Sequence, residues 1–230
     1  MKVEIWSDVM CPFCYIGKRR FEDALAQFEH KDSVEIEWKS FQLNPLLKTD
    51  PSISINDYLA ETKGWQPEYV HQLNEQVTEM ASQVGLTYNM DRAVVANSFR
   101  AHRFTHLAKQ HSLGIQAEEA LFAAYFTHGR NIDDLDTLAE LGELIGLNGA
   151  MVKENLSEKE FTANVYEDLR EAEELGITGV PFFVINRKYA VSGAQPEIVF
   201  LDALQKAGQD QEQLNPAIDG VSCDVNENNC

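Results

Sequence analysis

Apolar and polar residues alternate over residues 2–6 and again over residues 34–43. A period of two is typical of a β-strand with one buried face. Between these two stretches, apolar residues recur at the spacing of an amphipathic helix, at Phe21, Ala24, Leu25 and Phe28. Because two strands joined through a helix need a crossover connection, the pattern predicts a parallel pair of strands.

Helical periodicity dominates from Leu46 to Leu175. Asp91 and Ser157 are of the residue types that begin helices, and Ser157 with Glu160 forms the S-x-x-E pattern of a capping box. The apolar spacing predicts helices near residues 55–64, 66–84, 91–112, 115–128, 132–145 and 157–175. The aromatic residues expected in the core are Trp6, Trp38, Phe41, Phe122, Tyr125 and Phe126.

Strand signals return at residues 181–185 and 189–191, on either side of a turn, and a last helix is predicted over residues 196–207. Two α/β segments therefore flank a helical block, which one interrupted domain explains better than two tandem domains. The expected organisation is a discontinuous α/β domain of residues 1–45 and 176–220, a helical insertion domain of residues 46–175 and a C-terminal tail of residues 221–230.

The charge balance narrows the range of partners. The chain has 19 basic and 37 acidic residues, a net charge of -18. A protein this negative repels phosphate backbones and anionic lipid, so we expect neither nucleic acid nor a membrane surface as a partner. The first residues lack the apolar region and cleavage site of a secretory signal, and no run of about 20 apolar residues follows. If the sequence is complete, a cytoplasmic protein is expected.

The four cysteines fall into two local pairs, Cys11 with Cys14 and Cys223 with Cys230. Four cysteines are too few for a disulfide scaffold, which favours redox chemistry or metal binding. Cys11 and Cys14 follow a predicted strand and open a predicted helix, where the helix N-terminus stabilises a thiolate. The spacing places both sulfurs on one face of the first turn. Cys11 is therefore predicted to attack a substrate and Cys14 to resolve the mixed disulfide.

A zinc site is the main alternative for this motif. It would need a second pair of ligands at metal-typical spacing, but Cys223 and Cys230 are separated by six residues and no histidine is paired with either cysteine pair. We therefore expect no metal. The basic residues Lys18, Arg19 and Arg20 are expected to form a solvated helix face.

A second short motif, Gly179-Val180-Pro181-Phe182, stands directly before the returning strand. A proline at this place is restricted to the start or edge of a strand. Together, W-S-D-V-M-C-P-F-C-Y-I-G, the long helical block and G-V-P-F-F-V-I-N resemble the DsbA-like thioredoxin superfamily, in particular its FrnE-like cytoplasmic oxidoreductases. The resemblance covers residues 1–207.

The resemblance implies an α/β thioredoxin fold with a large all-helical insertion between the second and third strands. It also implies a thiol–disulfide oxidoreductase or disulfide isomerase that acts on proteins with thiols or disulfides. By position, Cys11 is the nucleophile, Cys14 the resolving cysteine and Pro181 a cis-proline beside them. The expected substrate contacts are Pro12, Phe13 and Val180. Phe13 replaces the histidine of the periplasmic members, which argues against their extreme oxidising power.

A sister branch, the kappa-class glutathione transferases and 2-hydroxychromene-2-carboxylate isomerases, shares this fold and uses glutathione with a serine at the nucleophile position. Cys11 and Cys14 favour redox chemistry without a cofactor, with glutathione as a candidate redox partner. A glutathione-dependent isomerase or transferase remains the alternative. A zinc-binding or chaperone-type module is a further one.

Two other features carry open alternatives. FrnE-like proteins can have a second cysteine pair near the C-terminus, so Cys223 and Cys230 are either a second redox pair that exchanges electrons with the first or thiols unrelated to it. The predicted helix 91–111 carries a basic stripe, which we expect to be a solvated face that pairs with the acidic helix 158–174. The alternative is that the stripe attracts acidic substrates or the carboxylates of glutathione. The stripe consists of Arg92, Arg100, His102, Arg103, His106, Lys109 and His111.

Overall fold

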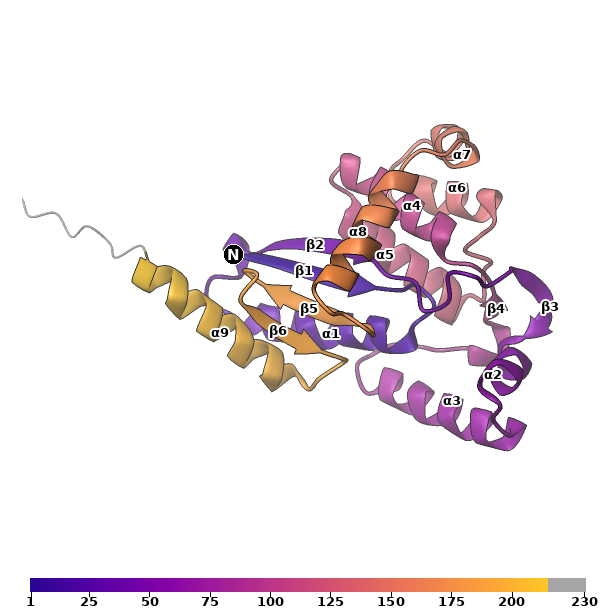
Figure 1. The fold of residues 1–230 in the computed structure, drawn as a ribbon, viewed down its shortest axis with the longest axis horizontal. Helices are drawn as coiled ribbons and strands as arrows, with labels where there is room; N and C mark the ends of the chain where they lie inside the picture. The colour runs from indigo at the N-terminus through magenta and orange to yellow at the C-terminus, as the bar shows by residue number, and fades with distance from the viewer. Residues whose placement is uncertain (215–230) are drawn as a thin grey trace, which may run out of the picture.

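The computed structural model describes the backbone of residues 1–214 and the side chains of residues 1–210. A four-stranded sheet lies at its centre, in the order β2-β1-β5-β6 (Figure 1). β1 is parallel to β2, β5 is antiparallel to β1, and β6 is antiparallel to β5. The parallel pair that the alternating pattern predicts is therefore confirmed, and so are the two returning strands predicted on either side of a turn. The strands are β1 (Lys2–Ser7), β2 (Glu35–Ser40), β5 (Phe182–Ile185) and β6 (Tyr189–Ser192).

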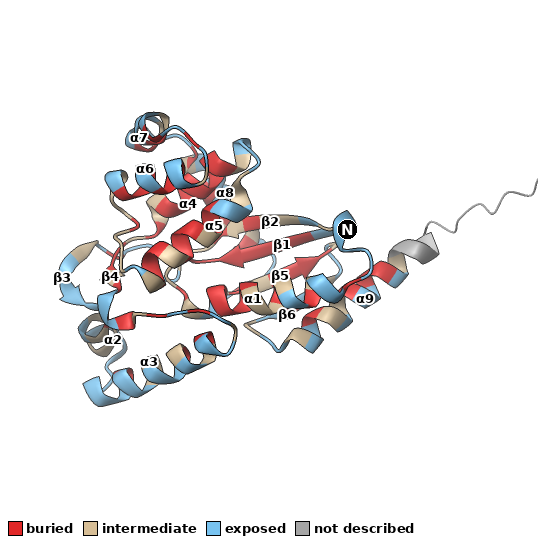
Figure 2. Cartoon of the chain, turned by 180° about the vertical axis from the view of Figure 1, so that it is seen from behind, coloured by how far each residue is buried: buried red, intermediate tan, exposed pale blue. Residues whose placement is uncertain are grey.

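Two helices cover one face of this sheet, α1 (Pro12–Gln27) and α9 (Glu197–Leu214) (Figure 2). Their aromatic side chains pack with the sheet: the Phe183 ring lies 5.5 Å from Phe21 and 4.7 Å from Phe200. All three rings are buried, so this face of the sheet forms the main core. α9 continues to Leu214, seven residues beyond the predicted end at Ala207.

α8 (Thr162–Glu174) packs against the opposite face of the sheet. The fully buried Trp6 contacts Ala172 and donates a hydrogen bond from Nε1 to the Asp168 carbonyl at 3.1 Å. Because side chains alternate along a strand, β1 presents Val3 and Ile5 to one core and Trp6 to the other.

The segment between β2 and β5 forms the insertion, which places it between the second and third strands of the sheet. Most of it is helical, and the fold class is confirmed. Its helices before α8 are α2 (Ile55–Lys63), α3 (Pro67–Ser82), α4 (Phe99–Gln110), α5 (Gly114–Phe122), α6 (Leu135–Leu144) and α7 (Gly149–Ser157), with a π-helical turn over Ala123–Thr127 and a 3-10 turn over Met90–Arg92. Another 3-10 turn, Lys31–Ser33, lies outside the insertion, between α1 and β2.

The expectation of an all-helical insertion is wrong in one respect. A two-stranded ribbon pairs β3 (Asp50–Ser54) with β4 (Val94–Val95). The ribbon also explains why the helix predicted to begin at Asp91 begins at Phe99: residues 90–95 first form a 3-10 turn and β4.

The predicted capping box at Ser157 is also wrong. Ser157 is the last residue of α7, and its hydroxyl donates to the Lys153 carbonyl at 2.7 Å. The next helix, α8, begins at Thr162, after Phe161 with a positive φ of 62°. The sequence pattern did not predict α7, whose N-terminus is capped by the Asn148 side chain.

The middle of the basic stripe is buried on α4 rather than solvated, whereas Arg92 and His111, which lie outside α4, are exposed as expected. The exposed fractions of His102, Arg103 and His106 are 2%, 7% and 8%. Arg103 donates to four backbone carbonyls at and after the end of α7, those of Asn155, Leu156, Glu158 and Glu160. The expected pairing with the acidic helix exists at one place, because His106 Nε2 lies 3.0 Å from the Asp168 carboxylate.

The basic residues of α1 form no solvated face either. Lys18 is buried and pairs with Glu22 and with Glu119 of α5, both at 2.6 Å. Arg19 contacts the same Glu119 at 2.5 Å, and Arg20 donates to the Ala194 carbonyl at 2.6 Å. These three residues therefore fasten α1 to the insertion and to the segment after β6.

Candidate active site

Cys11 and Cys14 lie at the junction of β1 and α1, as the sequence predicts. Cys11 is the N-cap residue of α1, with extended backbone, and Pro12 occupies the first turn, where its missing N–H needs no partner. The Cys11 amide donates to the Asp8 carbonyl at 2.9 Å, and the Cys14 amide to the Cys11 carbonyl at 3.0 Å. Both thiols are free. Cys11 therefore has the helix N-terminus beneath it, where a thiolate is stabilised.

The two thiols differ in their surroundings. Cys11 is 4% exposed, whereas Cys14 is completely buried. Burial raises the pKa of the Cys14 thiol well above its ordinary value, and the neighbouring Cys11 sulfur raises it further. The Ser7 hydroxyl and the Asp8 amide act in the opposite direction, because each can donate a hydrogen bond to a Cys14 thiolate. Of the two sulfurs, Cys11 is the one that a substrate can reach.

The Val180-Pro181 segment lies directly against Cys11. The Cys11 thiol points at the Val180 carbonyl, with 3.5 Å between sulfur and oxygen, and the Val180–Pro181 peptide bond is cis, as the resemblance implies. The Pro181 carbonyl accepts the Gly193 amide at 2.8 Å, which ties this segment to the end of β6.

A glycine allows α1 to approach Pro181 this closely. A Cβ atom on Gly17 would lie 2.9 Å from Cγ of Pro181, closer than non-bonded carbon atoms tolerate. Gly17 is one turn after Cys14, so its missing side chain lets the proline ring sit against the motif helix.

Three residues that the sequence analysis did not assign to the site also position the motif. The Tyr88 hydroxyl, from the insertion, donates to the Pro12 carbonyl at 2.7 Å. The buried Asp8 carboxylate accepts the Leu43 amide at 2.8 Å and lies 3.6 Å from Nε2 of His102. Burial alone would lower the pKa of His102, but the facing Asp8 raises it overall. No local pattern marks Tyr88 or His102, because their partners are remote in sequence.

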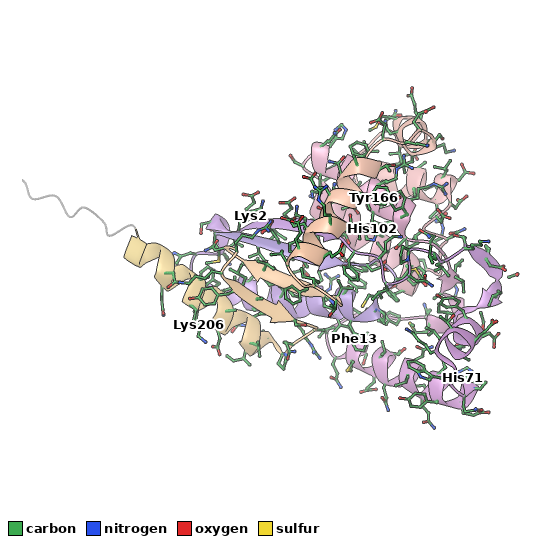
Figure 3. The ribbon with its side chains drawn as sticks, in the orientation of Figure 1. Lys2, Phe13, His71, His102, Tyr166 and Lys206 are labelled. Carbon is green, nitrogen blue, oxygen red and sulfur yellow. The ribbon has the colours of Figure 1, made fainter. Side chains whose placement is uncertain are left out.

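Phe13 is the exposed residue of the motif. It is 40% exposed and lies at the end of the sheet nearest α3 (Figure 3). Beside it is a cavity of about 530 Å³ lined by Met10, Pro12 and Phe13 on the motif side and by α2 and α3 on the other. The motif therefore meets the Val180-Pro181 segment at one side and an apolar cavity at the other.

The structure brings six predicted site residues together: Cys11, Pro12, Phe13, Cys14, Val180 and Pro181. The predicted second pair, Cys223 and Cys230, lies outside the described residues. Within the part of the chain that the structure describes, no three histidine, cysteine or acidic side chains are grouped so as to hold a metal ion. None of the helices described is long and apolar enough to cross a membrane.

Known proteins share this architecture. The Bacillus subtilis protein YwbO is 32% identical over 205 residues, which is 88% of this chain and 94% of YwbO. The crystal structure of the probable DsbA oxidoreductase SCO1869 from Streptomyces coelicolor superposes with a TM-score of 0.86 and 38% identity, covering 91% of both chains. The cytosolic disulfide reductase DsbM from Pseudomonas aeruginosa has the same fold at 18% identity and a TM-score of 0.63, covering 94% of this chain and 100% of DsbM.

The profile of the DSBA-like thioredoxin domain matches residues 2–205, which spans every strand of the sheet, the whole insertion and the first half of α9. The C-x-x-C motif at the N-terminus of α1 and the proline beside it lie within this match. The chain belongs to the DsbA-like thioredoxin-domain family of oxidoreductases.

Proposed function

We propose that this protein is a thiol–disulfide oxidoreductase that exchanges electrons with disulfide-bonded polypeptides through Cys11 and Cys14. The observation that carries the proposal is the asymmetry of the two sulfurs: Cys11 lies at the helix N-terminus against the Val180 carbonyl, and Cys14 is buried behind it. That arrangement suits a nucleophile and a resolving thiol. The family match supports the class of reaction.

The reaction has two steps. The Cys11 thiolate attacks one sulfur of the substrate disulfide, which forms a mixed disulfide and releases the other substrate sulfur as a thiolate. Cys14 loses its proton and attacks the Cys11 sulfur, which releases the second substrate thiolate and closes the Cys11–Cys14 disulfide. Two electrons thus pass from the motif to the substrate. The reverse sequence oxidises a substrate dithiol, and a partial sequence isomerises a disulfide.

Four further residues are assigned to the substrate. The Val180 and Pro181 backbone lies where an extended substrate segment would pair next to Cys11. Pro12 and Phe13 present apolar surface on the other side of the sulfur. No cofactor enters this scheme, because the electrons reside in the sulfurs.

Glutathione is proposed as the redox partner, with the cytoplasm as the place of action. DsbM, which shares the fold, is described as a cytosolic disulfide reductase and has been crystallised with glutathione. The same observation keeps a glutathione-dependent isomerase or transferase as the second candidate. That activity would need glutathione bound beside Cys11 and would survive the loss of Cys14.

The deciding experiment is a redox titration of the full-length chain in glutathione buffers, with alkylation and mass mapping of all four cysteines. A reversible Cys11–Cys14 couple is expected. A potential above about −200 mV would indicate an oxidase or isomerase and one near about −270 mV a reductase. The absence of any reversible couple would refute the proposal, and turnover that persists in Cys14→Ser would favour the second candidate. The same maps show whether Cys223 and Cys230 exchange with the motif.

A further inference from the structure

A buried hydroxyl group at the end of β1 has no hydrogen-bond partner. Ser7 is the last residue of β1 and is 2% exposed. Its Oγ atom is enclosed and makes no hydrogen bond to any of the residues described. Such groups are rare in folded proteins, because burial without a partner costs free energy, and a catalytic role is one of the few reasons for keeping one. What Ser7 does therefore depends on the groups that its hydroxyl faces.

The strand directs this hydroxyl group towards the helix that carries the motif. Side chains alternate along β1, so Ser7 shares a face with Ile5, opposite to Trp6. Ile5 belongs to the same buried cluster as Cys14, on the α1 side of the sheet. The backbone of Ser7 is held in place, since its carbonyl accepts the Phe41 amide at 2.9 Å. The hydroxyl group therefore lies on the side of the sheet where the resolving sulfur is buried.

The Cys14 sulfur is the reacting atom that this hydroxyl group can serve. Cys14 is completely buried, so a thiolate formed there needs hydrogen-bond donors from the protein instead of water. Burial raises the pKa of Cys14 most, and the Ser7 hydroxyl and the Asp8 amide are the two donors that lower it. A hydrogen bond to a charged group is stronger than one between neutral groups. The hydroxyl group therefore lacks a partner while Cys14 is protonated and gains one when the thiolate forms.

We propose that the Ser7 hydroxyl donates a hydrogen bond to the Cys14 sulfur as it becomes a thiolate, and that this bond speeds the resolving step. The inference rests on the proposed function and adds a residue to its second step. In that step the Cys14 sulfur attacks the Cys11 sulfur of the mixed disulfide. The bond between Cys11 and the substrate sulfur breaks, and its electron pair leaves on the substrate sulfur. The Cys14 proton passes to solvent, and Ser7 keeps its own proton throughout.

A donor to the thiolate changes the rate of this step and leaves its equilibrium unchanged. Near neutral pH Cys14 is protonated in the dithiol form, because burial holds its pKa well above the ordinary value. In the oxidised form its sulfur is part of the disulfide. The thiolate therefore exists only between the two forms. Ser7→Ala should slow resolution, while the reduction potential of the motif in glutathione buffers stays equal to that of the wild type.

The test separates the two steps with a coloured disulfide reagent, dithiobis(nitrobenzoate), in a stopped-flow instrument. The reduced full-length protein has Cys223→Ser and Cys230→Ser, so that only the motif reacts. Attack by Cys11 releases one coloured thiolate at a rate that rises with the reagent concentration. Attack by Cys14 then releases the second at a rate that does not depend on this concentration. The second phase therefore measures resolution alone.

In Ser7→Ala, the second phase near pH 7 is expected to be about three- to tenfold slower than in the wild type, with the first phase unchanged. A hydrogen bond to a charged group corresponds to a change of about one to two units in the Cys14 pKa. The more basic sulfur is also a better nucleophile, which restores about half of the lost rate on a logarithmic scale.

The matched control is Ser40→Ala. Ser40 pairs with Ser7 across the parallel strands and is 3% exposed, but its hydroxyl has a partner, Nε2 of His106 at 3.2 Å. Ser40→Ala should therefore lower the free energy of unfolding and leave both phases unchanged. Urea unfolding of the dithiol forms supplies the second measurement, in which Ser7→Ala should be at least as stable as the wild type.

The outcomes separate the failure of this inference from the failure of the proposed function. An unchanged second phase in Ser7→Ala, or an equal change in both phases, would overturn the inference. A shifted reduction potential, a loss of stability as large as that of Ser40→Ala, or an equal slowing in Ser40→Ala would overturn it too, because each would assign the hydroxyl to the fold. If the wild type releases no second thiolate, exchange through Cys14 does not occur and the proposed function itself is refuted.

Discussion

Removal of the hydroxyl group should change protein stability in opposite directions at two buried tyrosines that pack on the same phenylalanine ring. Tyr88 and Tyr125 are 5% and 1% exposed, and each packs on Phe126 with ring centroids 4.7 Å and 4.9 Å away. They differ in the hydroxyl. That of Tyr88 donates to the Pro12 carbonyl at 2.7 Å, whereas that of Tyr125 has no partner among the residues described.

The magnitudes follow from this difference. Tyr88→Phe removes a hydrogen bond that contributes about 0.5–1.5 kcal/mol, and the half-buried Pro12 carbonyl then has one donor fewer. Because a carbonyl in the first turn also accepts from its own helix, the expected loss in the free energy of unfolding stays near about 1–1.5 kcal/mol. Tyr125→Phe removes a desolvated hydroxyl that gains nothing, so the expected change lies between zero and a stabilisation of about 1 kcal/mol.

Urea unfolding of the full-length wild type and both variants, followed by circular dichroism, measures the two changes. The slopes should agree among the three proteins, so that differences in midpoint report stability. The contrast between the variants is expected to be about 1–2.5 kcal/mol. If Tyr125→Phe loses as much stability as Tyr88→Phe, the reasoning from hydrogen-bond partners is refuted.

Three further predictions concern the parts that hold the motif in place. Gly17→Ala should lower the free energy of unfolding by about 1 kcal/mol. The new methyl group would lie 2.9 Å from Pro181, which costs about 1–3 kcal/mol, whereas the higher helix propensity of alanine contributes about 1 kcal/mol of stability. A rise in the urea midpoint would contradict the contact. Arg103→Met should lower the free energy of unfolding by about 2–4 kcal/mol, because the buried guanidinium donates hydrogen bonds to four backbone carbonyls. Arg103→Lys should lower it as well, because the ammonium group of lysine cannot reach all four carbonyls at once. Thermal and urea unfolding of both variants test this. Burial alone would raise the pKa of Asp168, but His106 and the Ser40 amide lower it to about 2 from 3.8. Its stabilising effect is therefore complete above pH 4 and is lost as the pH falls towards 2. Between pH 5 and pH 2, the free energy of unfolding of the wild type should fall by about 2 kcal/mol more than that of Asp168→Asn. Parallel plots of this free energy against pH for the two proteins would show that the pairing is not stabilising.

The sequence predicted the parts of the fold that local patterns determine. Alternation marked β1 and β2, and an apolar run with a turn after it marked β5 and β6. The C-x-x-C motif with Pro181 identified the residues that the structure places together. Helix boundaries in the insertion were harder to predict, because residues 90–92 form a 3-10 turn and Val94 and Val95 pair with β3, about forty residues earlier. Such a pairing leaves no local signal, so a ribbon strand was interpreted as the start of a helix.

The interpretation of charged residues failed for a related reason. Spacing along a helix shows which side chains share a face, but it does not show what covers that face. Lys18 and Arg103 belong to basic runs that could equally face solvent, and both are buried because acceptors from α5 and α7 meet them. Buried cations require such partners, so a sequence can reveal them only after the packing of its helices is known.

The insertion contributes as much to the motif as the thioredoxin-like part does. The thioredoxin-like part supplies the two sulfurs, the helix N-terminus beneath Cys11 and the Val180-Pro181 backbone. The insertion supplies the Tyr88 hydroxyl on Pro12 and the His102 ring facing Asp8, and it closes the cavity beside Phe13. Since the chemistry of thiol exchange resides in the first part, differences in substrate among proteins of this fold are expected to reside in the second. Substitutions in α2 and α3 at positions that line this cavity should therefore change which disulfides react and leave the exchange chemistry of Cys11 and Cys14 intact.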